Sequence, residues 1–264
     1  MINFPQAMLI FGCGNMGGAM LRGWIAAGVD PARFTVVDPA ARDLPDGVVH
    51  MGSSHAVSLR YDAALLGIKP QMLGDLAGDV GALLAPGASL VSILAGTTCD
   101  TLSAHFPDAH IVRLMPNLAA AIGKSPLALY RSGGPDTAIE SWLAPLGSPI
   151  WLSSEDQMNA VTALAGSGPA FVYRFIDALR VAGTELGLPQ EVAASLALST
   201  VEGAALLAAT SDDPPAELAR RVTSPGGTTA AGLAVLDHES ALLHLVTETL
   251  RAARDRGDEL AKGK

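Results

Sequence analysis

Short apolar runs alternate with amphipathic stretches over the first 153 residues of the chain. Apolar runs bounded by turn-forming residues predict strands, and the stretches between them, apolar on one face, predict helices. The predicted strands are Ala7–Phe11, Phe34–Val37, Ala63–Ile68, Ser89–Leu94 and His110–Met115, followed by two edge strands, Leu127–Tyr130 and Pro149–Leu152. The predicted helices are Asn15–Ala27, Met72–Leu84, Cys99–His105 and Pro135–Leu146. This alternation is typical of βαβ units, so residues 1–153 are predicted to form a doubly wound, mostly parallel α/β domain.

After Ser153 the strand pattern gives way to long stretches rich in Ala and Leu. The predicted helices are Glu155–Ala165, Pro169–Leu186, Gln190–Ala209, Pro215–Val222 and Thr229–Ala253. Gly-Leu-Pro at 187–189 and Asp-Asp-Pro-Pro at 212–215 supply the stop and start signals between them. The charged tail from Arg254 to Lys264 is predicted to fray. Residues 154–264 are therefore predicted to form an all-α domain, whose small-residue faces can pack within the chain or against a second copy.

The chain of 264 residues is 49% hydrophobic and 16% charged, with a mean hydropathy of +0.34. Its longest apolar stretch, Val192–Ala209, is interrupted by Glu202 and by hydroxyl residues, so no membrane-spanning helix and no membrane partner are predicted. The net charge of −9 would repel a nucleic-acid backbone, and no nucleic-acid partner is predicted.

The first residues carry no basic segment of the kind that precedes a signal sequence, which predicts a cytoplasmic protein. The chain has two cysteines and six histidines. Their spacing matches no zinc or disulfide pattern, so no metal site is predicted.

A glycine-rich turn, Gly12-Cys13-Gly14-Asn15-Met16-Gly17, joins the first predicted strand to the first predicted helix. The first glycine permits a tight turn, the second lets backbone approach a pyrophosphate, and the third lets helix pack on strand. The helix N-terminus adds partial positive charge. An acid, Asp38, follows the second strand, where the ribose of a dinucleotide would lie. Together these features predict a Rossmann dinucleotide site, because a glycine turn that served packing alone would not require the acid.

Asp38 bears on which dinucleotide binds. A carboxylate there accepts hydrogen bonds from a ribose 2′-hydroxyl and repels a 2′-phosphate. Arg33 and Arg42 are near in the sequence and could offset that repulsion. The prediction is NADPH or NADH with a lean towards NADH, and the alternative for Asp38 is an ordinary solvated turn acid.

Three further strand ends fall on the same predicted carboxyl edge, where open α/β sheets bind ligands. Ile68-Lys69-Pro70 ends the third strand, and Lys69 is either a cofactor contact or a surface lysine. The fourth strand runs through Ser92-Ile93-Leu94 into small residues, Ala95-Gly96-Thr97, which leave room for a flat ring. Asn117 offers a donor and an acceptor suited to a carboxamide or a substrate, although asparagine is common in turns.

A second glycine-rich loop, Val222-Thr223-Ser224-Pro225-Gly226-Gly227-Thr228-Thr229, precedes the last predicted helix. Its glycines, proline and hydroxyl residues predict a concave run of backbone N–H groups that suits a carboxylate or phosphate. The alternative is a turn followed by a threonine N-cap, which would not need so many hydroxyl groups.

Taken in order, these motifs resemble those of the pyrroline-5-carboxylate reductase family, which catalyses the last step of proline synthesis. The motifs that carry the resemblance are G-x-G-x-M-G at Gly12–Gly17, K-P at Lys69-Pro70, S-x-x-A-G at Ser92–Gly96, R-x-M-P-N at Arg113–Asn117, G-S-G-P-A at Gly166–Ala170 and S-P-G-G-T-T at Ser224–Thr229. They span nearly the whole chain, and the last two are the most specific.

The resemblance implies a Rossmann domain, an all-α dimerisation domain, further assembly into decamers and an active site shared between subunits. It implies that NADPH or NADH gives a hydride to the C=N carbon of 1-pyrroline-5-carboxylate, forming L-proline. The cofactor residues are expected at Gly12, Gly14, Asn15, Met16, Gly17, Lys69, Pro70, Leu94 and Ala95, joined by Asp38, Ile68 and Asn117 from their places at strand ends. Substrate contacts are expected at Ser224, Gly227, Thr228 and Thr229, and the expected catalytic residues are Thr229, near the ring nitrogen, and Lys69.

Family members often carry small hydroxyl or basic residues after the second strand, whereas this chain has Val37-Asp38-Pro39. Hydride transfer to an imine needs no strong base, which agrees with a sequence that shows no catalytic histidine or cysteine pattern. Two alternatives stay open. One is a reductase of a related cyclic imino acid, and the other is a non-catalytic nucleotide-binding regulatory protein.

Overall fold

The computed structural model describes residues 4–41, 43–56 and 59–261. By internal packing the chain divides into two units: the first is Met1–Gly166 with Ala253–Lys264, and the second is Ser167–Ala252. This packing boundary falls later than the sequence boundary drawn at 153/154. Arg42, which entered the argument on the cofactor, lies outside the described residues.

One sheet organises the first unit. Its strands are β1 (Met8–Phe11), β2 (Phe34–Val37), β3 (Val49–Met51), β4 (Tyr61–Leu66), β5 (Leu84–Ser92), β6 (His110–Met115), β7 (Ser125–Tyr130) and β8 (Gly147–Trp151). They are ordered β3-β2-β1-β4-β5-β6-β7-β8. All neighbours up to β6 are parallel, β7 is antiparallel to β6, and β8 is parallel to β7. The strand order reverses between β1 and β4, which confirms the doubly wound Rossmann fold.

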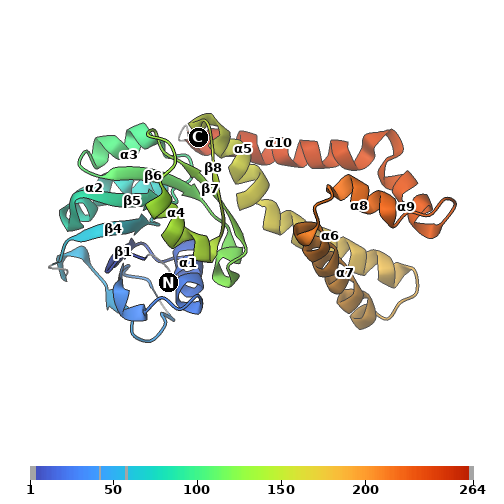
Figure 1. The fold of residues 1–264 in the computed structure, drawn as a ribbon, viewed down its shortest axis with the longest axis horizontal. Helices are drawn as coiled ribbons and strands as arrows, with labels where there is room; N and C mark the ends of the chain where they lie inside the picture. The colour runs from blue at the N-terminus through green and yellow to red at the C-terminus, as the bar shows by residue number, and fades with distance from the viewer. Residues whose placement is uncertain (1–3, 42, 57–58, 262–264) are drawn as a thin grey trace. The chain divides into compact units, whose positions relative to one another are not determined.

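Helices cover both faces of this sheet (Figure 1). They are α1 (Asn15–Ala26), α2 (Leu73–Leu83), α3 (Cys99–His105) and α4 (Thr137–Leu143). One buried cluster joins the sheet to α1 and α4, where the Trp24 indole donates a hydrogen bond to the Trp142 carbonyl at 2.6 Å. The other cluster joins the opposite face to α2 and α3. Burial on both faces explains why the central strands read as continuous apolar runs.

Short 3-10 turns connect these elements: η1 (Pro31–Arg33), η2 (Ser54–Ala56), η3 (Pro70–Met72), η4 (Leu118–Ile122), η5 (Ala144–Leu146) and η6 (Glu155–Gln157). After η6 come α5 (Met158–Val161) and a π-helical turn, η7 (Thr162–Gly166). The Asn159 side chain donates to the carboxylate of Asp258, near the end of α10 (Ala241–Ala261). The tail predicted to fray is therefore helical up to Ala261, because its last turns pack with the first unit.

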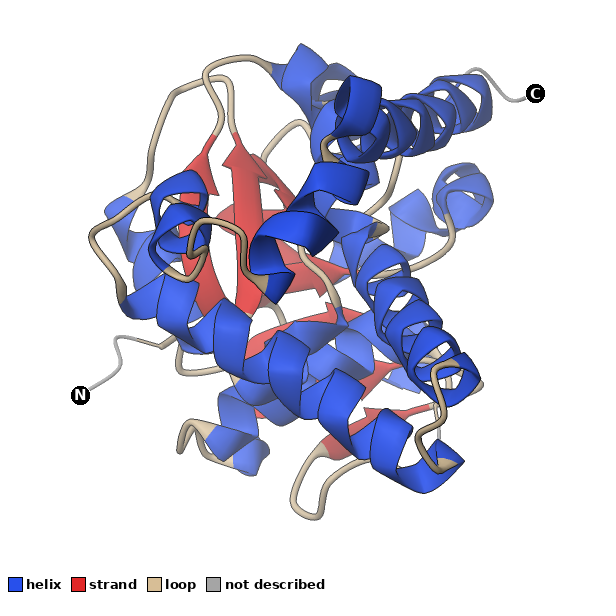
Figure 2. Cartoon of the chain, turned by 90° about the vertical axis from the view of Figure 1, so that its right-hand side faces the viewer, coloured by secondary structure: helices blue, strands red, loops and turns tan. Residues whose placement is uncertain are grey.

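The second unit is built from helices, and the described strands (red in Figure 2) all belong to the first unit. Its helices are α6 (Gly168–Glu185), α7 (Gln190–Thr210), α8 (Pro215–Arg221), α9 (Thr228–Leu236) and most of α10. The prediction of a single helix over Thr229–Ala253 is wrong. The chain turns at η8 (His238–Ser240), where Glu239 and Ser240 take positive φ angles of 48° and 59°.

Most apolar side chains of the second unit lie on its surface in a single chain. On α7 only Ala193 and Ala197 are buried, while Leu206 and Leu207 are 53% and 70% exposed. Within the described part of the chain, α7 is also the one helix long and apolar enough to cross a membrane, with a mean hydropathy of 1.7. A single helix of this composition is weak evidence for a membrane span, since helices that pack in protein cores share it.

Candidate functional site

The carboxyl ends of four strands meet at one edge of the sheet. The Gly12 amide donates to the Val37 carbonyl at 2.9 Å, and the Gly67 amide donates to the Phe11 carbonyl at 2.9 Å. A third hydrogen bond of 3.1 Å runs from the Ile93 amide to the carbonyl of Leu66. The loops that follow β1, β2, β4 and β5 are therefore neighbours, and they carry most of the residues predicted to contact a cofactor.

The three glycines of the first loop are required for different reasons. Gly12 has a φ of +88°, and a Cβ there would lie 2.7 Å from backbone atoms of Gly67 and Ile68. A Cβ on Gly17 would lie 2.8 Å from the Gly12 carbonyl oxygen, so this glycine lets α1 approach β1. Gly14 is exposed, and a Cβ there would meet nothing within 4 Å. The space over Gly14 is thus open for a ligand, as dinucleotide binding requires.

The carboxylate of Asp38 is fixed against this loop. One of its oxygens accepts a hydrogen bond from the Cys13 amide at 2.7 Å, and the other accepts one from the Ala40 amide at 2.8 Å. Its backbone amide donates to the Met51 carbonyl, and its carbonyl lies 2.9 Å from Nε2 of His50. The acid therefore lies at the end of β2, where the ribose of a dinucleotide bound over Gly14 would reach it.

Lys69 and Ala95 are the exposed members of the two neighbouring strand ends. Lys69 precedes the turn η3, whose first residue is Pro70, and its side chain makes no cap hydrogen bond. Leu94 is only 3% exposed and belongs to the α2 and α3 core cluster. The side chain of Leu94 therefore faces the core, and its backbone is the part available at the edge.

Asn117 has its side chain engaged inside the protein. Its Oδ1 accepts from the Ala119 amide at 3.0 Å, and its Nδ2 donates to the Ala165 carbonyl in the π-helical turn at 3.0 Å. The backbone N–H of Asn117 donates to Oγ of Ser125, and Asn117 is 6% exposed. This asparagine therefore holds the η7 turn in place, a role that sequence reasoning did not anticipate.

A buried ion pair joins strand β6 to the turn η6 and was missed in the sequence. Glu155 Oε1 accepts from Arg113 Nη1 at 2.7 Å and from the Cys99 amide at 2.7 Å. The Arg113 and Glu155 side chains are 6% and 22% exposed. The available signal was an arginine inside an otherwise apolar strand, because a buried guanidinium needs an acidic partner.

Neither cysteine is suited to act as a nucleophile. Burial, together with the negative charge of Asp38, raises the pKa of the Cys13 thiol to about 11. Burial and the charge of Glu155 raise the pKa of Cys99 to about 12. Both thiols are protonated at neutral pH, whereas the thiolate is the reactive form. Over the described residues, no group of three or more His, Cys, Asp or Glu side chains is placed to hold a metal ion.

The second glycine-rich loop belongs to the second unit and ends at the N-terminus of α9. Gly226 has a φ of +71°, and a Cβ on Gly227 would lie 2.5 Å from Oγ of Ser224. No side chain caps α9, and no acidic residue lies in its first turn. The first N–H groups of a helix have no partner within the helix, so those at Thr228 and Thr229 are available to an anion.

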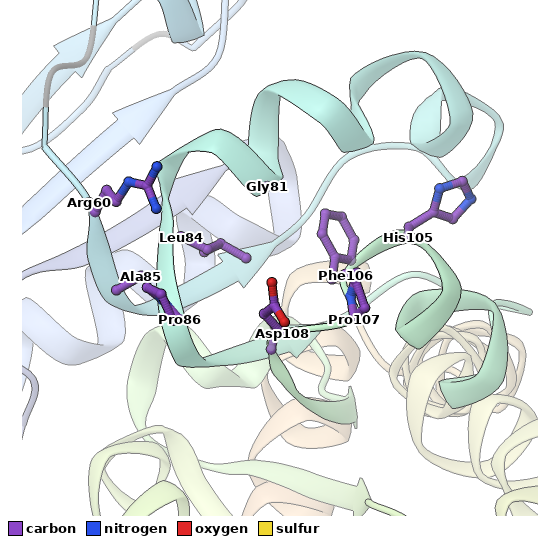
Figure 3. A pocket seen from close by; sticks show the side chains of 10 residues that line it. Arg60, Gly81, Leu84, Ala85, Pro86, His105, Phe106, Pro107 and Asp108 are labelled. Carbon is purple, nitrogen blue, oxygen red and sulfur yellow. The ribbon is translucent and has the colours of Figure 1, made fainter.

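A separate pocket of about 130 Å³ opens at the other edge of the sheet (Figure 3). It is lined by residues at the amino ends of β4, β5 and β6, among them Arg60, Leu84, Phe106 and Asp108. Open α/β sheets bind their ligands at the carboxyl ends of the strands, so this pocket is distinct from the site described above.

The Rossmann sheet, the open glycine loop and the acid after β2 define a dinucleotide-binding protein, and the uncapped N-terminus of α9 adds a second anion-binding feature. Residues 155–260 match the family model for pyrroline-5-carboxylate reductase dimerisation, and residues 7–96 match that for NADP oxidoreductase, coenzyme F420-dependent. The chain belongs to the pyrroline-5-carboxylate reductase family.

Pyrroline-5-carboxylate reductases from several organisms match three quarters or more of the chain. A pyrroline-5-carboxylate reductase from Pseudomonas aeruginosa is 35% identical over 261 residues, which is 95% of each protein. One from Synechocystis is 39% identical over 208 residues, or 76% of each. The solved structure of a pyrroline-5-carboxylate reductase from Coxiella burnetii matches with a TM-score of 0.87 and 30% identity, covering 97% of this chain and 99% of that one. The Plasmodium falciparum pyrroline carboxylate reductase with NADP bound matches with a TM-score of 0.84, 25% identity and coverage of 97% and 98%.

Proposed function

We propose that this protein reduces the C=N bond of 1-pyrroline-5-carboxylate with a reduced nicotinamide dinucleotide, forming L-proline in the last step of proline biosynthesis. One observation carries the proposal: in each unit a glycine-rich turn leads into a helix whose N-terminus has no side-chain cap. The first of these N-termini lies at Gly14, where a pyrophosphate fits, and the second lies at Thr228 and Thr229, where a carboxylate fits. Family membership identifies the acid as the pyrroline carboxylate.

A nicotinamide dinucleotide supplies the hydride when it is bound, so the chain itself must bind, orient and hold a proton. Gly12, Gly14 and Gly17 shape the pyrophosphate site, with Asn15 and Met16 opening the helix behind it. Asp38 holds the ribose. Ile68, Lys69 and Pro70, with the backbone of Leu94 and Ala95, flank the ring from the neighbouring strand ends.

The substrate residues act through the N-terminus of α9. The amides of Thr228 and Thr229, with the hydroxyl of Ser224, neutralise the carboxylate, and Gly227 keeps room for it. The Thr229 hydroxyl is proposed to donate a hydrogen bond to the imine nitrogen, which gains the electron pair of the C=N bond and needs a proton as the hydride adds to the carbon. Lys69 is proposed to act through its charge at the cofactor edge.

A second candidate substrate is a related cyclic imino acid. The N-terminus of α9 would bind the carboxylate of the substrate through backbone N–H groups, and these contacts do not depend on the size of the imino acid ring. A panel of cyclic imino acids of different ring size separates the two candidates by kcat/KM.

The family model over residues 155–260 supports a homo-oligomer built through the helical unit. The exposed leucines of α7 are consistent with such an interface and offer an alternative to a membrane for that helix. Assembly into decamers, a cytoplasmic location and the lack of membrane and nucleic-acid partners stay predictions. Light scattering and cell fractionation test them.

The function is tested with purified protein, 1-pyrroline-5-carboxylate and either reduced dinucleotide, following the loss of absorbance of the reduced nicotinamide. We expect turnover and formation of L-proline. Absence of turnover with both dinucleotides would contradict the proposed function.

Substituting Thr229→Ala should lower kcat/KM about tenfold or more, because a hydrogen bond to the reacting nitrogen is lost. Thr229→Ser, which keeps the hydroxyl, should retain most of the activity. Thr210→Ala removes a hydroxyl that donates to the Leu206 carbonyl within α7 and should leave kcat/KM unchanged. Unchanged kinetics in Thr229→Ala, with an unchanged melting temperature, would remove Thr229 from the mechanism.

A further inference from the structure

The carboxylate of Asp38 is held at the end of β2 from two directions. The Cys13 amide comes from the glycine loop and the Ala40 amide from the turn after β2, at 2.7 and 2.8 Å. The carboxylate cannot rotate away from the ribose position without breaking both hydrogen bonds, and hydrogen bonds to charged groups are the stronger class. Asp38 is also half-buried, so water screens its charge only in part.

Each oxygen of this carboxylate keeps one lone pair after the two backbone hydrogen bonds are made. Those lone pairs can accept the protons of ribose hydroxyl groups. A 2′-phosphate offers mainly unprotonated oxygens near neutral pH, so it would bring negative charge against a fixed carboxylate with little to donate. The geometry therefore favours a ribose with a free 2′-hydroxyl.

Among the described residues, no arginine near this strand forms an ion pair with Asp38, although the charge of Arg22 acts on the neighbouring Cys13 thiol. Arg33 lies at the opposite end of β2, where its Nη1 donates to the carbonyls of Phe4 and Pro5 at 3.3 and 3.5 Å. The expectation that Arg33 offsets the repulsion at Asp38 is therefore wrong. The Arg22 guanidinium lies along α1, 3.3 Å from where a Cβ of Gly18 would be, and makes no ion pair with Asp38 among the described residues.

We infer that this chain selects NADH over NADPH, and that Asp38 is the residue that sets the selection. The inference rests on the proposed function and adds the identity of the cofactor to it. The inferred preference for NADH differs from the name of the family model that matches residues 7–96, which refers to NADP oxidoreductases.

The test is direct binding of NADH and NADPH to the full-length protein, measured by titration calorimetry. We expect NADH to bind at least about tenfold more tightly, with the same order in kcat/KM. Asp38→Asn keeps the side-chain shape and removes the charge, and it should raise the affinity for NADPH about tenfold while weakening NADH. Asp38→Ser serves the same purpose if the first variant has a lowered melting temperature.

Asp30→Asn is the matched control. Asp30 lies before β2, at the opposite strand end, and its carboxylate likewise accepts a backbone hydrogen bond, from Ala32 at 2.9 Å. Losing that charge should leave the ratio of NADH to NADPH affinity unchanged.

The outcomes are distinguishable. If neither dinucleotide binds, the proposed function fails as well. If NADPH binds as tightly as NADH, or more tightly, the selection is overturned while the function stands. If NADPH binding is strong and is lost in Arg22→Gln, the 2′-phosphate is held by Arg22 and the assignment to Asp38 is wrong. If Asp38→Asn and Asp30→Asn change the ratio equally, the effect is one of net charge, which also overturns the assignment.

Discussion

At the scale of single residues, Gly14 and Gly17 differ in whether the packing of the protein leaves room for a side chain. A side chain at Gly17 would collide with the carbonyl of Gly12, whereas one at Gly14 would point into open space. Gly14 also has a φ of −69°, which any residue can adopt. The packing of the free protein therefore does not require a glycine at position 14, whereas the close approach of a dinucleotide would.

Alanine substitutions at Gly14 and Gly17 should differ in their effects on stability and on dinucleotide binding. Gly14→Ala should change the free energy of unfolding by less than about 0.5 kcal/mol, because it adds no contact, and should weaken dinucleotide binding about tenfold or more. Gly17→Ala should lower the free energy of unfolding by about 1–3 kcal/mol, because α1 must shift away from β1. Denaturant unfolding and calorimetric titration of both variants check this. Equal loss of stability in the two would contradict it.

Residue types at strand ends predicted that Gly12, Asp38 and Lys69 lie at the carboxyl edge of the sheet, and the structure brings these strand ends together; their contacts with a cofactor stay a prediction. What the sequence could not show is which side chains have other partners. Leu94 faces the core, and the side-chain amide of Asn117 donates a hydrogen bond to the carbonyl of Ala165, 48 positions away in the chain. A contact of that separation depends on the tertiary fold and leaves no local pattern.

At the scale of elements, Glu155 ties together β6, the start of α3 and the turn η6. It does so through the two hydrogen bonds from Arg113 and Cys99, in a place where Arg113 is almost fully buried. Removing one partner of a buried pair leaves the other charge without compensation, which costs more than the pair itself contributes.

Glu155→Ala should therefore lower the free energy of unfolding by about 3 kcal/mol. The control is Glu217→Ala, whose pair with Arg220 on α8 is exposed and should change stability by about 1 kcal/mol or less. Urea unfolding of both variants measures the difference. A loss in Glu155→Ala no larger than in the control would show that Arg113 finds another partner.

Most elements were predictable because the buried strands are short continuous apolar runs and the helices between them are amphipathic. The missed strand, β3, has only three residues, and its Val49 and His50 are exposed, so no buried face marks it. The break between α9 and α10 was missed because no glycine or proline lies between Leu233 and Arg256. Glu239 and Ser240 have positive φ angles there, which are usual for glycine and which no glycine in this segment indicates.

At the scale of the whole molecule, the helical unit leaves more apolar surface exposed than a stable monomer would. Leu207 on α7 and Leu243 and Leu245 on α10 are each at least 65% exposed. Association with a second copy would bury such side chains, and each fully buried leucine contributes about 1.5–3 kcal/mol.

Leu207→Asp should therefore shift the protein towards monomers, because a charge at an apolar interface is costly to bury. Leu59→Asp is the control, since Leu59 is 65% exposed in the first unit and should not affect association. Light scattering across a concentration series measures both. A Leu207→Asp protein as associated as the unchanged one would place the interface away from α7.

The last described turns of α10, residues 253–261, pack with the sheet-bearing first unit. The helical unit is thus an insertion rather than an appendage, and its removal by a stop codon would also strip the final turns of α10 from the sheet-bearing half. To study nucleotide binding in isolation, one would splice the segment ending at Gly166 to the one beginning at Ala253 through a flexible bridge. In evolution, likewise, a domain inserted in this way can be exchanged for another only if both of its junctions with the first unit are kept.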